Sequence, residues 1–334
     1  MRLKPIHNIR YSKMTPIENH DLRLLSESIL TNVKRLDLDL TNRSIVTECA
    51  TGHYVCTPLI ALLSNAQSVT AFGQNTQYGT FEQAKQLLMD TAEFMGLPLE
   101  RLTVTNERTL LKQRLHRADI LTNTGHLRPI DKEMIACLPE KAVIPLMYES
   151  WEYREGDLDL REAQKKGIRV IGTNECLPEV NIFDFLGELV IKSLLNVGID
   201  ILGHTIILVC DNPFKTFIKR VLMNHGCRVL FSEDEIGSAK VNGIIFAHTP
   251  IVCGGKGQIC FKNLPEKVEY CCQLWGDVRR EKFDTLWIPQ IEPRPGHMGL
   301  LLSELGPEPI VRLQTASLKA AQEFLNGHVD SPFI

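Results

Sequence analysis

The chain has 334 residues, of which 44% are hydrophobic and 23% are charged. This composition is typical of a soluble globular protein with two domains, and it excludes a disordered chain. Lys and Arg number 37 against 40 Asp and Glu, so the net charge is −3. The bulk charge therefore favours neither nucleic acid nor an anionic membrane as a partner.

The spacing of the cysteines and of the apolar residues bears on metal binding, secretion and membrane insertion. The ten cysteines contain no C-x-x-C pair, and H-E-x-x-H spacing is absent, so we expect reduced thiols and no metal. Residues 1–14 lack the apolar core of a signal peptide. The most apolar stretch, residues 182–210, is interrupted by charged side chains. The sequence therefore predicts a cytoplasmic protein without a membrane span.

The first half of the chain alternates short apolar runs with amphipathic segments. Residues 1–40 form a helical extension, whose helix over 17–33 starts after Pro16. We expect strands at 44–48, 68–72, 101–104, 120–122, 142–147 and 169–171, and helices at 53–64, 80–95, 107–114, 131–137 and 158–166. This alternation predicts a parallel sheet that is covered on both faces.

A second unit of the same kind follows a long apolar helix over residues 182–196. We expect strands at 205–210, 228–231 and 243–247, and helices at 213–225 and 316–325. The fold class is α/β: two Rossmann-like parallel-sheet domains, flavodoxin-like plus dinucleotide-binding, joined by long helices. The predicted domains are the extension 1–40, a substrate-type α/β domain 41–181 to which 300–334 return, and a dinucleotide-binding domain 182–299. A single doubly wound sheet is the alternative architecture.

The turn after residues 205–210 is the candidate cofactor site, because a strand, a turn, a helix and a second strand follow one another there. In a dinucleotide site this turn places the pyrophosphate on the helix N-terminus, and an acid after the second strand binds the ribose. The residues that fit these roles are Asp211, Asn212, Lys215 and Thr216 for the phosphates and Glu233 for the ribose. Glu233 and its acidic neighbours favour NAD over NADP. The turn lacks the glycine fingerprint, so a βαβ unit that binds no nucleotide is the alternative.

Three further segments carry candidate site residues. Glu149 lies in a polar and aromatic cluster, residues 147–155, where a strand ends; an exposed loop with a packing Trp is the alternative. His297 directly follows Pro295 and Gly296 on a rigid turn, which suits proton transfer, although a histidine in a loop is often structural. In the first unit, Gly52 and His53 follow a strand that ends in Glu48, as in a methyltransferase. The next strand, however, ends without the acid that S-adenosylmethionine would require.

The order of these pieces resembles the D-isomer-specific 2-hydroxyacid dehydrogenases and their relative, adenosylhomocysteine hydrolase. The resemblance covers roughly residues 110–300 and rests on loose motifs at 118–131, 138–145, 156–160, 167–175, 205–233 and 244–250. It implies that Arg279 or Arg280 binds a substrate carboxylate and that His297 is the catalytic histidine. Asp277 and Glu292 are the acids available to orient His297, and His248, Thr249 and Pro250 line the cofactor site. It also implies a dimer formed through the region of residues 182–196.

These observations lead to one leading function and two alternatives. The leading function is an NAD(P)-dependent oxidoreductase, with NAD preferred, acting on a small 2-hydroxy or 2-keto acid or a related polar metabolite. The alternatives are a non-catalytic ligand-binding or assembly protein that retains the dehydrogenase fold, and an S-adenosylmethionine-dependent methyltransferase. We also expect a homodimer, because the helix over 182–196 is apolar nearly all round.

Overall fold

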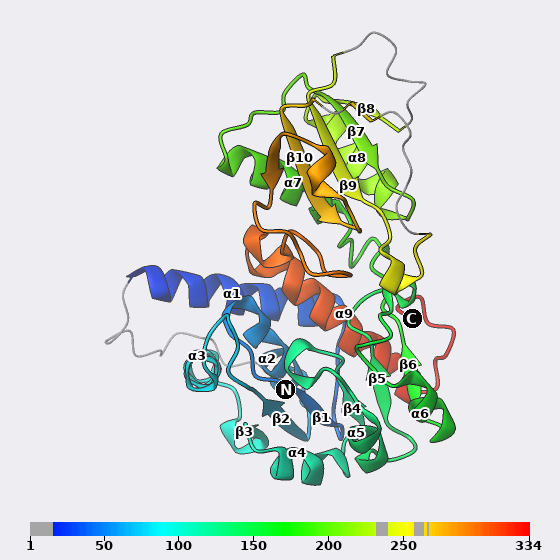
Figure 1. Ribbon diagram of the computed structural model, residues 1–334. Coiled ribbons are helices and arrows are strands. Elements are labelled where there is room, and N and C mark those ends of the chain that lie inside the picture. Colours follow the sequence, from blue (N-terminus) through cyan, green and yellow to red (C-terminus); the bar gives the residue numbers. More distant parts are fainter. Residues whose placement is uncertain (1–15, 232–239, 257–263, 266) are drawn as a thin grey trace. The chain divides into compact units, whose positions relative to one another are not determined.

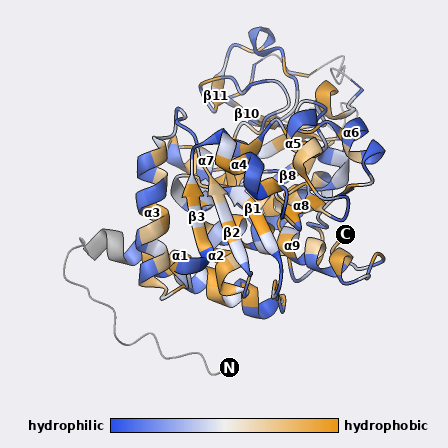
Figure 2. Ribbon diagram, turned by 90° about the horizontal axis from the view of Figure 1, so that it is seen from below, coloured by the Kyte–Doolittle hydropathy of each residue, from blue (hydrophilic) through white to orange (hydrophobic). Residues whose placement is uncertain are grey.

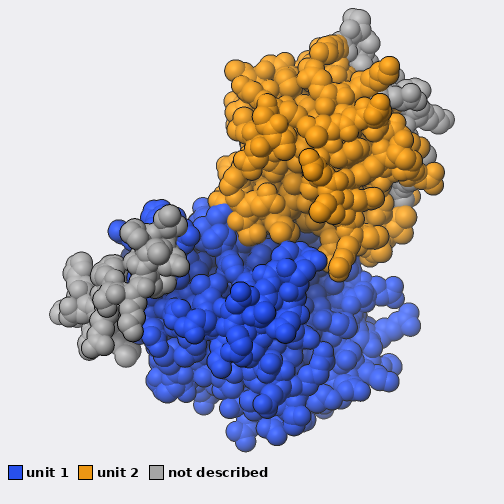
Figure 3. Space-filling model, turned by 60° about the vertical axis from the view of Figure 1, so that its left-hand side comes forward, with its two compact units in different colours: residues 1–180, 306–334 blue, residues 181–305 orange. Residues whose placement is uncertain are grey.

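The computed structural model describes residues 16–231, 240–256, 264–265 and 267–334. The chain divides into two compact units (Figure 3). The first unit comprises Met1–Val180 and Gly306–Ile334, and the second comprises Asn181–Leu305. The C-terminal segment of the chain thus belongs to the same unit as the N-terminal half.

The first unit is built on a sheet of six parallel strands in the order β3-β2-β1-β4-β5-β6 (Figure 1). The strands are β1 (Ser44–Glu48), β2 (Ser68–Phe72), β3 (Leu102–Thr105), β4 (Ile120–Leu121), β5 (Val143–Pro145) and β6 (Arg169–Ile171). In the centre of the sheet, Ile45 lies opposite both Val69 and Ile120. The strand order changes direction between β1 and β4, which is the place where α/β sheets bind ligands.

Helices cover both faces of this sheet. They are α1 (Pro16–Arg35), α2 (Cys56–Leu63), α3 (Phe81–Phe94) and α9 (Pro307–Leu325), and on the other face α4 (Arg108–Leu115), α5 (Lys132–Cys137) and α6 (Leu160–Lys165). Side chains fix the start of three of them: Thr80 forms a capping box with Gln83, and Asp131 and Asp159 accept amide hydrogen bonds at α5 and α6. Helix α3 presents a hydrophilic and a hydrophobic side in Figure 2, as expected for a surface helix.

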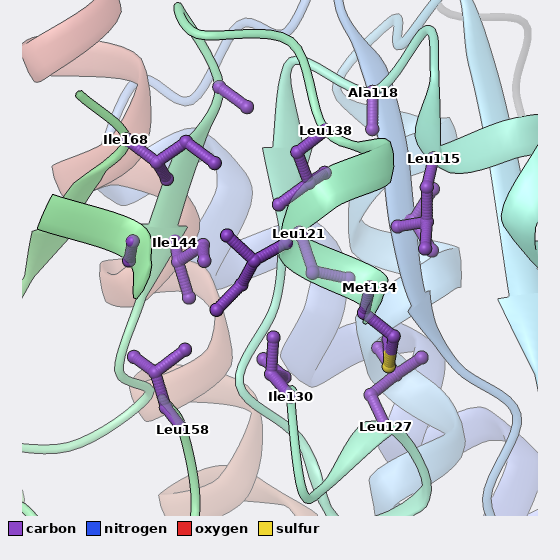
Figure 4. Close-up of a cluster of buried hydrophobic side chains, with 14 of the residues drawn as sticks. Leu115, Ala118, Leu121, Leu127, Ile130, Met134, Leu138, Ile144, Leu158 and Ile168 are labelled. Atoms are coloured by element: carbon purple, nitrogen blue, oxygen red, sulfur yellow. The ribbon is translucent and has the colours of Figure 1, made fainter. Parts of the chain in front are cut away.

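A hydrophobic core fills the space between the sheet and helices α4, α5 and α6 (Figure 4). Leu121 and Ile144 come from the strands, and Met134 comes from α5; each is at most 5% exposed. Burial of such side chains is worth roughly 1.5–3 kcal/mol each. This core forms the floor beneath the loop that follows β4.

Helix α9 is longer than the predicted helix over 316–325, because it begins at Pro307. Proline is well tolerated in the first turn of a helix, where its missing N–H leaves no bond unmade. Helix α9 lies beside α1 in Figure 1 and packs on α1, α2 and β5. Its Lys319, only 7% exposed, donates to the carbonyl of Asp37 and pairs with Glu323 at 2.8 Å.

The second unit contains a sheet of five parallel strands in the order β11-β10-β9-β7-β8. The strands are β7 (Thr205–Val209), β8 (Arg228–Leu230), β9 (Gly243–Ala247), β10 (Tyr270–Trp275) and β11 (Leu286–Ile288). Helices α7 (Asp184–Asn196) and α8 (Phe214–Asn224) pack against each other. Gly187 permits their close approach, since a Cβ there would lie 2.5 Å from the Cβ of Val221. A cluster of Phe246, Phe283 and Trp287 packs on the sheet around Cys271.

The predicted fold class, two Rossmann-like units on parallel sheets, is confirmed, and the single-sheet alternative is wrong because the strands form two separate sheets. The six strands of the first unit follow the 3-2-1-4-5-6 order that is typical of dinucleotide-binding domains. The five strands of the second unit, numbered from β7, follow the 2-1-3-4-5 order of flavodoxin. The described part of the chain holds no helix long and apolar enough to cross a membrane. Its nine cysteines form no disulfide.

Candidate functional site

In the first unit, a cavity of about 120 Å³ lies where the strands end. It is bounded by Phe72, the last residue of β2, by the start of α4, and by the loop between β4 and α5. Leu127 and Met134 form part of its apolar wall and lie near each other in Figure 4. Its polar wall consists of Arg108, His126, Arg128 and Asp131.

His126 is held in one orientation by Gln74, which follows β2. The backbone N–H of Gln74 donates to Nδ1 of His126 at 3.0 Å, and the Gln74 side chain donates to the His126 carbonyl at 2.9 Å. Because Nδ1 accepts a hydrogen bond, the neutral ring carries its proton on Nε2. Burial lowers the pKa of His126, which favours this neutral form. The ring therefore offers one N–H donor.

Glu48, at the end of β1, anchors the loop that carries His126. Its carboxylate accepts from the backbone N–H of His126 at 3.1 Å, and the side chain is only 4% exposed. Burial raises the pKa of Glu48 to about 7, although the hydrogen bond from His126 and the charge of Arg128 act in the opposite direction. The charge of this group therefore changes near neutral pH.

Arg128 is fixed by a polar network behind the cavity. Its Nε donates to the Asn123 side chain at 3.0 Å, and its Nη2 donates to the Asn123 carbonyl at 2.6 Å. Its Nε also lies 3.4 Å from a carboxylate oxygen of Asp157, which pairs with Arg154 at 2.9 Å. Both guanidinium groups lie over the ring of Tyr148, at 5.3 and 5.5 Å.

The network leaves excess positive charge beside the cavity, since Asp157 is shared by Arg128 and Arg154. Nη1 of Arg128 makes no hydrogen bond within the described residues, and neither does the exposed guanidinium of Arg108. Among the lining residues, Asp131 is a carboxylate whose Oδ1 accepts from two amides of α5, and the guanidinium groups of Arg108 and Arg128 outnumber it. Together with the N–H of His126, these groups can hold a small anion.

In the second unit, the structure brings together several of the predicted cofactor residues. Asp211 accepts from the backbone N–H and the hydroxyl of Thr249, at 2.8 and 3.1 Å. The side chain of Asn212 donates to the carbonyl of Ala247 at 2.8 Å and to the Thr249 hydroxyl at 3.3 Å. The turn after β7 is thus bonded directly to the segment after β9.

Other predicted cofactor residues lie around this turn. Lys215 and Thr216 are exposed in the first turn of α8, and the Lys215 ammonium lies 4.3 Å from the centre of the Phe231 ring. Pro250 is buried. Glu233 lies outside the described residues.

His248 is 3% exposed, and its pKa is lowered by burial. Its Nε2 lies 3.2 Å from the carbonyl of Asp277, and its Nδ1 has no partner within the described part of the chain. The Asp277 carboxylate accepts from the N–H of Ile251 at 2.8 Å. Gly276, at a φ of 106°, allows this packing, because a Cβ there would lie 2.5 Å from the His248 ring.

The three remaining residues predicted for catalysis in this unit lie in the loops before and after β11. Arg280 stacks on Trp287 at 4.6 Å and bonds to Gln273 and to the carbonyls of Pro289 and Gln290. Arg279 and His297 are exposed on separate loops. Arg280 is therefore held in the packing of the loop before β11, with four of its contacts made inside the unit.

Glu149 and His53 belong to the first unit. The Glu149 carboxylate accepts from the backbone N–H of Glu175 at 2.8 Å, and burial raises the pKa of Glu149. His53 is half-buried in the turn after β1, and burial lowers its pKa. Neither residue lines the cavity.

Sequence reasoning did not single out Arg108, His126 or Arg128. The available signal was the run from Thr122 to Arg128, a polar loop directly after a buried strand, which we assigned only through the family resemblance. Such loops form ligand sites in parallel sheets. Arg108 belongs to the start of α4, and its proximity to this loop follows from the strand order.

No protein-family model matches the chain, and no curated protein sequence matches it either. Solved structures do. A dipicolinate synthase chain from Bacillus subtilis is 11% identical, with a TM-score of 0.51 over 87% of this chain and 99% of that one. The corresponding dipicolinate synthase chain from Bacillus halodurans is 10% identical, with a TM-score of 0.49 over 88% and 100%. NAD+-bound 3-phosphoglycerate dehydrogenase from Entamoeba histolytica is 13% identical, with a TM-score of 0.45 over 86% and 97%. At these identities the likeness concerns the fold alone, which is the two-unit α/β arrangement that this chain has in common with the Bacillus subtilis structure.

Proposed function

We propose that the protein binds a small carboxylic acid in the cavity of the first unit. The observation that carries this proposal is the set of N–H donors of Arg108, His126 and Arg128 on one wall of a cavity of about 120 Å³. A cavity of about 150 Å³ accommodates benzene, so this one suits a ligand of about six heavy atoms. That is the size of a three-carbon 2-hydroxy or 2-keto acid.

The chemistry of the wall supports the same ligand class. The guanidinium groups of Arg108 and Arg128 suit a carboxylate, which can accept two N–H bonds from one arginine. The Nε2–H of His126 suits a hydroxyl or keto oxygen on the neighbouring carbon. Phe72, Leu127 and Met134 provide an apolar surface for a short alkyl group.

Oxidation or reduction of the bound acid by NAD is the further activity that the dehydrogenase-like fold suggests. It requires a nicotinamide cofactor in addition to the acid. The turn after β7 is where a domain of this fold class would hold the phosphates of that cofactor. The binding of the acid rests on the first unit alone. Binding of the acid and binding of the dinucleotide are therefore tested in separate experiments.

Isothermal titration with a panel of two- to five-carbon 2-hydroxy and 2-keto acids tests the binding proposal. Arg108→Gln removes a guanidinium that has no partner among the described residues, and His126→Asn retains an acceptor for the Gln74 N–H while removing the Nε2 donor. Each should weaken binding by about 10- to 100-fold, since a hydrogen bond to a charged group contributes about 1.5–3 kcal/mol.

Arg114→Gln is the matched control, because it removes the same charge from an exposed position on α4 outside the cavity wall. It should leave the affinity within about twofold, the size of effect left by distant surface charges. If no acid of the panel binds, or if Arg108→Gln and Arg114→Gln weaken binding equally, the cavity is not the site. Adding S-adenosylmethionine to the panel examines the methyltransferase alternative with the same instrument.

A further inference from the structure

The first turn of α8 is the place where this fold class holds the pyrophosphate of a dinucleotide. The phosphates require free backbone N–H groups and residues small enough for the backbone to approach them. In this chain the turn reads Cys210-Asp211-Asn212-Pro213-Phe214-Lys215 and contains no glycine. Whether a dinucleotide fits therefore depends on what the N–H groups and side chains of the turn do.

Two N–H groups at the start of α8 are already in use. The N–H of Phe214 donates to the Asn212 side chain at 3.1 Å, and the N–H of Lys215 donates to the Asn212 carbonyl at 3.2 Å. Pro213 has no N–H. The N–H groups of Phe214 and Lys215 thus face oxygen atoms of Asn212 and not a phosphate oxygen.

The side chains of the turn also close the gap at which the strand order reverses. Asp211 and Asn212 bond to Ala247, the last residue of β9, and to Thr249 just beyond it, in four hydrogen bonds of 2.8 to 3.3 Å. We call Asp211, Asn212 and Thr249 the clasp. The carboxylate of Asp211 is exposed and would repel a phosphate placed beside it.

The nearest basic side chain faces a different partner. The ammonium of Lys215 lies 4.3 Å from the centre of the Phe231 ring, and Lys219 lies 4.9 Å from the same centre. These are cation–π distances. The residues of this turn therefore do not fit the pyrophosphate of NAD.

We infer that the clasp takes the place of the dinucleotide phosphates, so that the second unit binds no dinucleotide at the start of α8. The Asn212 oxygen satisfies the helix N-terminus as a phosphate oxygen would, and Asp211 supplies the negative charge. The side chains of the clasp thus make the contacts at the start of α8 that a bound dinucleotide would otherwise make. This inference is independent of the acid-binding proposal for the first unit.

Titration of the full-length protein with NADH, followed by NADH fluorescence, tests the inference directly. We expect no saturable binding up to 1 mM, about the upper end of ordinary Michaelis constants. Saturable binding that Lys215→Glu weakens tenfold or more would place the dinucleotide at α8 and overturn the inference. Binding that Lys215→Glu leaves unchanged lies elsewhere on the chain, and the clasp assignment then stands.

A second measurement examines the clasp without a ligand. Thr249→Val removes the hydroxyl that bonds to both Asp211 and Asn212, and Asp211→Ala removes the other partner. Each should lower the melting temperature of the second unit by about 3 to 6 °C, and the double variant by less than the sum, because the two residues share a contact. Thr216→Val, at an exposed position in the same turn, is the control. Melting temperatures equal to that of the parent would show that the clasp does not complete the unit.

Discussion

Replacing Glu48 by Gln should stabilise the protein above neutral pH and have little effect at pH 5. Burial raises the pKa of Glu48 from 4.5 to about 7 in the folded chain. As the pH rises through this interval, the unfolded chain loses the proton while the folded chain keeps it, so the free energy of unfolding falls. A tenfold change in an ionisation constant corresponds to about 1.4 kcal/mol, which gives a total loss of roughly 3 kcal/mol at pH 8. Glutamine retains an oxygen for the His126 N–H and carries no charge.

The assay is urea denaturation followed by circular dichroism at several values between pH 5 and pH 8.5. The difference in unfolding free energy between Glu48→Gln and the parent should grow by roughly 3 kcal/mol across this range, most of it below pH 7. Glu82→Gln, which removes a carboxylate from the exposed side of α3, should give a difference that does not vary in this way. A pH-independent difference for Glu48→Gln would show that the folded state holds this carboxylate at its ordinary pKa. The reasoning about burial would then be refuted.

Four further outcomes follow from the packing and the charges. Affinity for a carboxylic acid in the first unit should fall as Glu48 ionises near pH 7 and remain constant in Glu48→Gln, as titrations at pH 6 and pH 8 can show. Gly187→Ala should cost about 1–3 kcal/mol in denaturant unfolding, since its Cβ would collide with Val221; an unchanged midpoint would contradict the close approach of α7 and α8. Thr80→Ala should cost about 1 kcal/mol through loss of the capping box, whereas Thr80→Ser should be nearly neutral. Sedimentation equilibrium should give about twice the monomer mass of 37.8 kDa. Leu195→Glu, at an apolar side chain of α7 that is 49% exposed, should reduce this mass. A parent that sediments as a monomer ends the dimer hypothesis.

The alternation of strands and helices could be predicted from the spacing of apolar residues. They recur every three to four positions in the helices and form short continuous runs in the buried strands. Runs such as Ile120–Leu121 and Gly243–Ala247 are apolar and short, as strands buried on both faces are. The strands Tyr270–Trp275 and Leu286–Ile288 were not predicted, because no α-helix among the described residues separates them from the preceding strands, and the strand–helix alternation that marked the other strands is missing there. Helix α9 was predicted too short, since it begins at Pro307 and not at Ala316, with the prolines at 307 and 309 in its first turn.

The candidate site was harder to predict than the fold, for a geometric reason. Arg108 and His126 become neighbours only because β3, β2, β1 and β4 are adjacent in that order, and no local pattern encodes strand order. The clasp has a similar origin, since Asp211 and Thr249 are separated by 38 positions and meet across the pairing of β7 with β9. The sequence analysis assigned Asp211, Asn212 and Thr249 to one cofactor site. It did not predict the hydrogen bonds that join their side chains.

The return of α9 to the first unit bears on how the chain is assembled during synthesis. Residues 181–305 form a unit that is complete before Gly306–Ile334 have been made. The first unit, in contrast, lacks the helix that covers α1, α2 and β5 until Pro307–Leu325 have left the ribosome. Domains generally fold as units while the chain is synthesised, so the second unit can reach its native state first, although its sequence starts later. A released chain that ends at residue 305 should then protect β7 and β9 from protease while β1 and β2 are still cleaved.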